Sequence, residues 1–493
     1  MNSKEPKHSL SNRISYGCAD IYGGGAFVVI STFYTVFLTK SLGMPTALAG
    51  TIPLIGKIWD AVTDPLMGNI ADRTRSKMGA KRFWMLVGSI ISALTFIVMW
   101  IPYTAGGSVM GQYIFYVLMY MLFSTGFTIV MVPYNGLLPD MVEDYTLRAK
   151  YSSVRMAFSA FGAIIAGLIP TLMIKDNTNA GQYMTVSFVF AVIFLVAILV
   201  TVFGTWEKQK EIRKTTLSET FTQSFTVFKS HSFRLFIGIF IFGQAAADFI
   251  TGLAVYYIDD VLNAYGGGNF TKLMGVILVS QFLGMILFAP IMAKTSKKFP
   301  ILFGTPFRII ATFAMLFFSY EGAPFVVILI LSFIIGLSMA GVSSSIYAIL
   351  SDLVDVDELI TSISRPGICS GMATFTRKIA AGLSSAMIGV LLAMVGYDET
   401  IANAGLRQSA ATQHGIAYIY VFAQIVLLVL TVAFAVLFPV TKREFDIVRK
   451  DVARRKGEDT SLPTAEEVAV CEKVTGFKYD KLWNANNALK FKG

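Results

Sequence analysis

Runs of about 20 apolar residues, separated by short polar segments, recur along the whole chain. A run of this length crosses the roughly 30 Å hydrocarbon core of a bilayer as an α-helix, and a helix satisfies its own backbone hydrogen bonds where water is absent. The composition agrees, because 55% of the 493 residues are hydrophobic and 15% are charged, whereas a typical soluble domain has about 25% charged residues. The sequence therefore predicts an all-α protein that crosses a membrane many times.

The apolar runs predict twelve spans, at residues 19–39, 47–70, 83–103, 110–135, 151–174, 183–205, 232–258, 271–293, 300–320, 324–350, 368–396 and 414–438. Lys and Arg gather in the loops after the second, sixth and eighth spans and in the segment after the twelfth, whereas the opposite loops hold few of them. The positive-inside rule then places both termini in the cytoplasm. The net charge of +10 follows from this asymmetry and needs no nucleic-acid partner. The polar N-terminus lacks the apolar core of a cleavable signal.

A long polar segment divides the predicted spans into two sets of six. The basic loop ADRTRSK after the second span has a counterpart, AKTSKK, after the eighth. Two parallel six-helix repeats, with the substrate site at the midplane between them, are typical of secondary transporters. The tail contains an amphipathic piece, PTAEEVAVCEKVTGFKYDKLW, which we interpret as lying on the membrane surface. The expected parts are an N-terminal segment 1–18, a bundle 19–205, a cytoplasmic linker 206–231, a bundle 232–438 and a cytoplasmic tail 439–493.

The second span carries charge inside an apolar run. Lys57, Asp60 and Asp64 occupy positions i, i+3 and i+7, which share one face of a helix. Each charge costs about 2.5–3.5 kcal/mol at the bilayer centre, so this face must look into protein or a watery cavity. Two carboxylates one turn apart repel each other unless a cation lies between them. Na⁺ or a proton meets this need, with Thr63 as an oxygen ligand and Lys57 as a replacement charge. The alternative is a structural ion cluster.

Three other spans carry an ionisable residue whose role stays open. Asp20 opens the first span and either contacts a cation or a solute hydroxyl, or only marks a helix end. Arg155, one turn into the fifth span, has donors suited to a carboxylate. It either reaches the Asp60–Asp64 pair or a solute, or snorkels to the interface. Asp248, in the seventh span, either binds a proton or a sugar, or makes an interhelical hydrogen bond.

Span eleven contains the sequence TFTRK. Arg377 and Lys378 are adjacent and point about 100° apart on a helix, so one of them faces the cavity better. We favour Lys378, because it shares a face with Thr374 at i, i+4, and we assign Arg377 to charge balance. Tyr134 is a candidate for stacking on a sugar.

Two further observations concern oxygen ligands and metals. Thr128, two turns before Asn135, is a candidate oxygen ligand for the cation. The three cysteines and three histidines show no spacing typical of a disulfide framework or a His/Cys metal site. We therefore expect no cofactor beyond the coupling ion.

Taken together, these residues resemble the glycoside–pentoside–hexuronide:cation symporters of the major facilitator superfamily, the group that includes melibiose permease. The resemblance covers about residues 15–449. The motif KIWDAVTDP in the second span is specific. The supporting motifs are SYGCAD, VPYNGLLPDM, VRMAF, ITGLAVYY, LSDLVDVDE and TFTRK.

The resemblance implies a fold of two pseudo-symmetric six-helix bundles that rock about the midplane in alternating access. It also implies that Asp60, Asp64 and Thr128 form the cation site for sodium or a proton. Arg155 and Lys378 would then line the shared cavity. Thr374 and Asn135 join Asp20, Tyr134 and Asp248 as candidate solute-binding residues.

The chain departs from melibiose permease at its sugar-binding positions. Gly23 and Gly24 stand where that transporter has a Lys-Asp pair, and Met131 and Asn135 align with its sugar-binding Asp and Trp. Ser343 aligns with a further Trp. The cavity is thus less acidic than in a galactoside carrier, which favours an anionic solute such as a hexuronide over a neutral disaccharide.

The sequence therefore predicts a symporter of a glycoside, pentoside or hexuronide in a bacterial inner membrane, working as a monomer in contact with lipid. A lysolipid or amphiphile carrier of the same superfamily is the alternative within transport. A polytopic membrane transferase and a non-transporting sensor are the alternatives from other classes, although no Cys/His pair or nucleotide-binding loop supports an enzyme.

Overall fold

The computed structural model describes residues 9–142, 145–207, 224–264 and 268–488, and the described residues form helices and loops without any β-strand. The α-helices are α1 Leu10–Cys18, α2 Asp20–Val29, α3 Thr46–Arg73, α4 Ala80–Val98, α5 Val109–Met141, α6 Tyr145–Met173, α7 Ala180–Gly204, α9 His231–Tyr256, α10 Asn269–Lys294, α11 Phe299–Met315, α12 Phe325–Thr361, α13 Pro366–Met394, α14 Glu399–Asn403, α15 Ala410–Tyr418, α16 Gln424–Leu437, α17 Lys442–Lys456 and α18 Ala465–Thr475. Short π-helical segments are η1 Ile30–Tyr34, η2 Phe37–Ser41, η5 Tyr257–Val261 and η8 Ile419–Ala423, and short 3-10 segments are η3 Ala105–Gly107, η4 Phe225–Lys229, η7 Leu316–Phe318, η9 Tyr479–Lys481 and η10 Ala485–Ala488.

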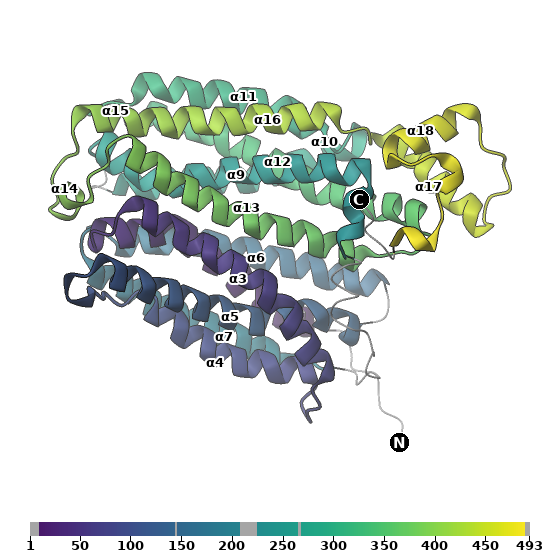
Figure 1. Cartoon of the computed structure of the whole chain (residues 1–493), viewed down its shortest axis with the longest axis horizontal. Helices are drawn as coiled ribbons and strands as arrows, with labels where there is room; N and C mark the ends of the chain where they lie inside the picture. The colour runs from purple at the N-terminus through teal and green to yellow at the C-terminus, as the bar shows by residue number, and fades with distance from the viewer. Residues whose placement is uncertain (1–8, 143–144, 208–223, 265–267, 489–493) are drawn as a thin grey trace.

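The long helices form two bundles whose helices run roughly along the long axis of the molecule (Figure 1). Helices α3 to α7 belong to the first bundle, and α9 to α13 with α16 belong to the second. This arrangement confirms the predicted all-α fold with two bundles. Most of the predicted linker, residues 208–223, lies outside the described residues.

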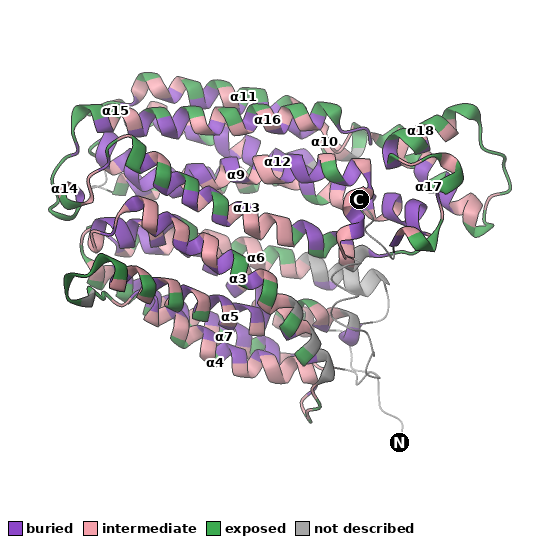
Figure 2. Ribbon diagram, viewed as in Figure 1, coloured by how far each residue is buried: buried purple, intermediate pink, exposed green. Residues whose placement is uncertain are grey.

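Exposed residues lie along the outer sides of both bundles (Figure 2), and many of them are large apolar side chains. Phe188 on α7 and Ile310 on α11 are 60% and 66% exposed. Ten helices among the described residues are long and apolar enough to cross a membrane. Apolar side chains on such outer faces contact lipid rather than water. Two predicted spans differ from these ten, because 19–39 is divided among α2, η1 and η2, and 47–70 is the charged helix α3. Twelve crossings and cytoplasmic termini stay predictions.

Helices α3 and α13 join the two bundles at close range. A Cβ atom at Gly50 would lie 2.7 Å from the Ser385 carbonyl oxygen, and one at Gly382 would lie 2.8 Å from the Leu54 Cα atom. Any side chain at these two positions would clash with the opposite helix. Glycine has none, so the backbones of α3 and α13 approach each other closely. This contact sets the distance between the charged residues that the two helices carry.

The basic loops noticed in the sequence have equivalent structures in the two halves. Lys81, at the start of α4, donates to the Gly136 carbonyl oxygen (2.9 Å) and forms an ion pair with Asp140 on α5. Lys297, just before α11, donates to the Ala348 carbonyl oxygen (3.1 Å) and forms an ion pair with Asp352 on α12. In each half the acceptor carbonyl lies four residues before the aspartate. The weak sequence repeat therefore has a geometric counterpart.

The tail folds as a cap on one end of the second bundle (Figure 1). Ser232 of α9 donates to the Val474 carbonyl oxygen at 2.6 Å, and the Trp483 amide donates to the Leu359 carbonyl oxygen of α12 at 2.8 Å. Cys471 and Val474 are fully buried. The interpretation of this piece as membrane-skimming is wrong, because these apolar side chains on α18 are buried within protein.

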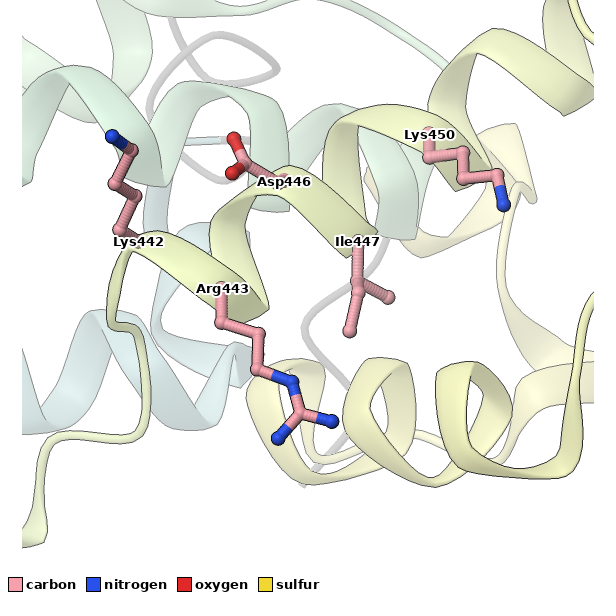
Figure 3. A pocket seen from close by; sticks show the side chains of 5 residues that line it. All are labelled: Lys442, Arg443, Asp446, Ile447 and Lys450. Carbon is pink, nitrogen blue, oxygen red and sulfur yellow. The ribbon is translucent and has the colours of Figure 1, made fainter.

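A surface hollow of about 530 Å³ lies on α17 and is lined by Lys442, Arg443, Asp446, Ile447 and Lys450 (Figure 3). Two of its basic residues are already paired with α18, since Arg443 contacts Glu466 and Lys450 contacts Glu467. The hollow belongs to the tail and contains none of the residues that the sequence predicts to bind cation or solute.

Candidate ion and solute site

The acidic residues of α3 meet a lysine from the other bundle. Lys378 on α13 places its Nζ atom 2.5 Å from Asp64 Oδ2 and 3.6 Å from Asp60 Oδ2. Lys57, on α3 itself, lies 3.3 Å from the same Asp60 oxygen. Two lysines thus neutralise two carboxylates. Lys57, Asp60 and Asp64 therefore lie on one face of α3, as expected, and Lys378 links this face to the other bundle.

The two carboxylates differ in access. Asp60 is fully buried, whereas the Asp64 side chain is 29% exposed. Asp60 Oδ1 has no hydrogen-bond partner among the described residues. Lys57 is buried too, and its ammonium lies 3.4 Å from the centre of the Phe27 ring. A buried carboxylate oxygen without a donor is a lone pair available to a cation or proton.

The two predicted threonine ligands behave differently. Thr128 on α5 donates its hydroxyl to Asp64 Oδ1 at 2.6 Å. Thr63 donates to the Trp59 carbonyl oxygen of its own helix at 3.2 Å, so the structure does not bring Thr63 into the cluster. The adjacent position explains this, because residues 63 and 64 point about 100° apart. The described residues contain no group of three or more His, Cys, Asp or Glu side chains that could hold a metal, so sodium would rest on two carboxylates and hydroxyl oxygen.

A second polar cluster lies within the first bundle. Arg155 on α6 donates from Nε to Asp20 Oδ2 at 3.0 Å and from Nη2 to Asn135 Oδ1 at 2.7 Å. Its guanidinium stacks over the Tyr134 ring at 4.7 Å. Arg155 therefore pairs with Asp20 and does not bridge to the Asp60–Asp64 pair, which was one of its expected partners.

Tyr134 and Asn135 contact Arg155 in different ways. Tyr134 is buried, and its hydroxyl donates to the Tyr16 carbonyl oxygen at 2.9 Å. Because Arg155 covers one face of its ring, Tyr134 is not presented for stacking on a sugar in this structure. Asn135 is exposed, and among the described residues only the oxygen of its side-chain amide is hydrogen-bonded, to Arg155.

The second bundle repeats this arrangement. Arg377 on α13 donates to both carboxylate oxygens of Asp248 on α9, at 2.8 and 2.6 Å. In the order of the expected spans, α9 and α13 belong to the first and fifth spans of their half, and α2 and α6, which carry Asp20 and Arg155, belong to the first and fifth spans of theirs. Each half therefore has an aspartate–arginine pair at this position. Thr374, one turn before Lys378, is exposed.

At one end of the bundles, charged residues of the two halves contact each other. Lys40 in η2 is buried, and its Nζ atom lies 2.7 Å from Asp259 Oδ2 and 2.8 Å from Asp260 Oδ2 in η5. The Asn177 amide also donates to Asp259 at 3.1 Å, and the Asn403 amide donates to the Lys40 carbonyl oxygen at 3.1 Å. A pocket of about 290 Å³ opens beside this network. The basic-residue pattern predicts that this end faces the periplasm.

Sequence reasoning missed this network of Lys40, Asp259 and Asp260, which we call the gate. Lys40 was visible as a basic residue in a loop otherwise poor in them, and Asp259 and Asp260 as an acidic pair at the end of the seventh span. Both positions end the first long helical segment of their half, and both lie in π-helical turns, which occur frequently at functional sites. The sequence signal that could have identified these residues is that they occupy matching positions in the two halves.

The structure also explains two departures from melibiose permease. A side chain at Gly23 would collide with the Asp20 carboxylate and with Met131, and one at Gly24 would collide with Ser159 of α6. The Asp20–Arg155 pair and the close contact of α2 with α6 therefore fill the space of the missing Lys-Asp pair.

The family model described as "MFS/sugar transport protein" matches residues 15–442. An uncharacterized symporter of Synechocystis, sll1374, is 35% identical over 42% of this chain and 39% of its own length. A putative sulfoquinovose importer of Escherichia coli is 25% identical over 94% of this chain and 97% of its own length. An isoprimeverose transporter of Lactiplantibacillus pentosus is 24% identical over 84% and 86%.

Among solved structures, a bacterial homologue of the human lysosomal transporter Spinster superposes with a TM-score of 0.65. It is 14% identical, and the match covers 88% of this chain and 98% of that one. That transporter was captured in an inward-facing, unoccupied conformation. The likeness establishes that the two bundles are arranged as in a major facilitator transporter.

Proposed function

Because the chain belongs to the MFS/sugar transport protein family of the major facilitator superfamily, we propose that it is a secondary active symporter that carries a sugar-type solute together with Na⁺ or H⁺. As a member of this family with apolar membrane helices, it is a multi-pass protein of the bacterial inner membrane. Its relatives and its fold are those of transporters rather than enzymes. The proposal needs the coupling ion but no organic cofactor, and a monomer suffices for it.

The contact of Lys378 with Asp64 carries this proposal. A lysine of one bundle occupies the position between the carboxylates of the other, where a small cation would lie. A cation that binds Asp60 and Asp64 must displace this ammonium, because both satisfy the same negative charge. Binding of the ion thereby breaks a bond between the halves and frees Lys378 for the solute. Ion binding and rearrangement of the bundles are then coupled through one side chain.

The charges of the site favour an anionic solute. Lys57, Lys378, Arg155 and Arg377 are matched by Asp60, Asp64, Asp20 and Asp248, so the ion-free site is neutral. One bound Na⁺ or H⁺ adds a positive charge, which is costly to carry through a membrane interior. A solute with one negative charge restores neutrality. This arithmetic supports a uronide or another acidic sugar as the solute.

The names of two relatives refer to different kinds of sugar. The putative sulfoquinovose importer is named for a sulfonated, anionic sugar, and the isoprimeverose transporter is named for a neutral disaccharide. We therefore base the choice of an anionic solute on the balanced pairs of this chain. Lys378 is the proposed contact for the acidic group of the solute. Arg155 and Asn135 are the proposed contacts for its hydroxyls, and Thr374 is a further donor from the second half.

The closed end of the molecule supports alternating access. Lys40 links the halves on the predicted periplasmic side, whereas Asn135 and Thr374 are exposed. We propose that this arrangement is the state open to the cytoplasm, from which ion and solute leave.

The first experiment records external pH and sodium while single solutes are added to cells or vesicles that contain the protein. The panel holds uronides, other acidic sugars, neutral glycosides, pentosides and a lysolipid. We expect a transient change in external sodium or pH when an acidic sugar is added. Asp64→Asn should abolish this change. The control Asp446→Asn, which alters an exposed tail carboxylate, should retain it.

Two results would contradict the proposal. Accumulation against a gradient that persists in both Asp60→Asn and Asp64→Asn rules out this ion site. Uptake of neutral sugars without competition by uronides rules out the anionic solute while leaving symport in place. A response to the lysolipid alone would instead support the amphiphile carrier.

A further inference from the structure

Arg308 of α11 is a fully buried arginine, and no carboxylate of the described residues pairs with it. Its Nη2 atom donates to the Ala246 carbonyl oxygen at 3.0 Å and, at 3.4 Å, to the Gln424 side-chain oxygen. Both acceptors are neutral. Its Nε and Nη1 atoms have no hydrogen-bond partner among the described residues. The arginines of the candidate ion and solute site, Arg155 and Arg377, each have a carboxylate partner, so Arg308 is a different case.

The surroundings of Arg308 are rich in hydroxyl groups that also lack partners. Thr305 and Thr312 lie three residues before and four residues after it, on the same face of α11, and Tyr420 comes from η8. All three are fully buried, and none of their hydroxyls has a hydrogen-bond partner within the described part of the chain. Tyr420 lies close enough to Arg308 to interact with it electrostatically.

Neighbouring contacts show that this is not a general feature of the region. Tyr257 stacks on Tyr420 with ring centres 4.3 Å apart, and its own hydroxyl is bonded to Ser319 at 3.0 Å. Gln424 donates to the Tyr420 carbonyl oxygen at 2.7 Å. Tyr257 and Gln424, which contact Tyr420, are therefore hydrogen-bonded, whereas the Tyr420 hydroxyl and the Nε and Nη1 atoms of Arg308 have no partner among the described residues.

The chemistry of these groups selects one class of ligand. An arginine stays protonated in proteins, so Arg308 cannot escape its burial by losing a proton, and an uncompensated charge inside a membrane protein is costly. The unpaired nitrogens of the guanidinium are donors, and each hydroxyl can donate as well. The matching ligand is an anion. It must be small, because every residue that surrounds it is fully buried.

We propose that Arg308, with the hydroxyls of Tyr420 and Thr312, binds a small inorganic anion of the size of chloride between α9, α11 and η8. The anion neutralises the guanidinium and joins α11 to η8, while Arg308 itself bonds to the Ala246 carbonyl oxygen of α9. This site takes no part in the proposed coupling at Asp60 and Asp64, and the proposal does not depend on which solute is carried.

The test uses the full-length protein purified in detergent, with gluconate as the only mobile anion at the start. Thermal unfolding is followed while gluconate is replaced by chloride, bromide or sulfate at constant ionic strength. We expect the midpoint temperature to rise with chloride and bromide in a saturable way, and to stay unchanged with sulfate. Arg308→Gln should abolish the halide effect, and the control Arg407→Gln, which changes an exposed arginine, should keep it.

Two milder variants keep the test decisive if Arg308→Gln does not fold. Tyr420→Phe and Thr312→Val each remove one donor, and each should raise the half-saturating halide concentration about tenfold, the effect of one hydrogen bond to a charged group. A crystal grown in bromide should show an anomalous peak beside Arg308. An unfolding temperature of the wild type that ignores halide, a halide effect that survives in Arg308→Gln, or only water beside Arg308 in bromide crystals would each overturn the proposal.

Discussion

Lys378 Nζ lies 2.5 Å from Asp64 Oδ2 and so joins α13 of the second bundle to α3 of the first. The pair is only partly shielded from solvent, with the lysine and aspartate side chains 17% and 29% exposed. A partly exposed ion pair is weaker than a sealed one and can be exchanged for another cation. In the proposed function the lysine therefore competes with the coupling ion, and this role leads to the first prediction.

Replacing Lys378 by methionine should increase the affinity for the coupling ion about tenfold, which corresponds to about 1.4 kcal/mol. The ammonium no longer has to be displaced, and its positive charge no longer opposes the ion. Solute accumulation should nevertheless be lost, because nothing then links ion binding to the other bundle. Titration of the purified protein with sodium at several pH values measures the affinity, and vesicle uptake measures accumulation.

Lys378→Arg is the matched control for this change. It retains the charge, so ion affinity should stay close to that of the wild type even if the different shape of the guanidinium lowers uptake. An ion affinity of Lys378→Met equal to that of the wild type would show that the lysine does not compete with the ion.

Removing the hydroxyl of Thr128 should weaken ion binding. This hydroxyl donates to Asp64 Oδ1 at 2.6 Å, and a hydrogen bond to a charged group contributes about 1.5–3 kcal/mol. Without it Asp64 loses its fixed orientation towards Asp60. We expect Thr128→Val to lower the apparent sodium affinity about tenfold or more, or to shift the pH dependence of uptake if the ion is a proton.

Thr128→Ser keeps the hydroxyl and should behave like the wild type. Thr63→Val provides a second comparison, because the Thr63 hydroxyl is bonded to its own helix. If Thr63→Val impaired ion dependence more than Thr128→Val, the ion would have to lie on the other side of α3.

The spacing of charged residues predicted which side chains share a face, and it did so for α3 and α13. Lys57 and Asp60 are in contact within one turn of α3, and Lys378 rather than Arg377 turns towards Asp64. These are local relationships, and helix geometry determines them. The aspartate partner of Arg155 could not be found in this way, because Asp20 lies on another helix, and periodicity does not say which helix a face meets.

The position of the tail and the ion pairs of Lys40 could not be predicted from the sequence, for the same physical reason. The apolar residues of α18 predict an amphipathic helix, but whether lipid or protein covers its apolar side depends on the adjoining surface, here the ends of α9 and α12. Lys40 and the Asp259–Asp260 pair are far apart in sequence. Only the packing of the two bundles brings them together.

Breaking the gate at Lys40 should shift the molecule towards the state open on that side. Lys40 is buried against two carboxylates, and removing one partner of a buried ion pair typically costs about 3–5 kcal/mol. The difference between two functional conformations is a few kcal/mol. We therefore expect Lys40→Met to expose the gate, measured as faster maleimide labelling of a cysteine introduced at Ala402 in a background without the native cysteines.

Asn177→Ala removes only the 3.1 Å hydrogen bond to Asp259 and should change the labelling rate far less. Arg407→Gln, at the exposed rim of the same pocket, should leave it unchanged. Equal labelling in Lys40→Met and the wild type would mean that the Lys40 network does not hold the halves together.

The cap formed by the tail should control the reactivity of Cys471. This residue is fully buried, and burial, reinforced by the nearby Asp451 carboxylate, raises the pKa of its thiol to about 12. Only the thiolate reacts, so labelling by maleimide should be very slow at pH 8 and should increase about tenfold per pH unit up to about pH 12. Cys18 and Cys369 are replaced by alanine so that the signal comes from Cys471 alone.

Opening the cap should restore an ordinary thiol. Asp451 is buried and accepts bonds from Arg455 Nε at 2.9 Å and from the Tyr479 hydroxyl at 2.6 Å, so Asp451→Ala leaves a positive charge without its partner inside the cap. An exposed thiol has a pKa near 8.5, and labelling at pH 8 should then accelerate about a thousandfold. Glu466→Ala removes an exposed ion pair and should have no effect. Rapid labelling of Cys471 at pH 8 in the otherwise unchanged protein would show that the tail is not held against α9 and α12.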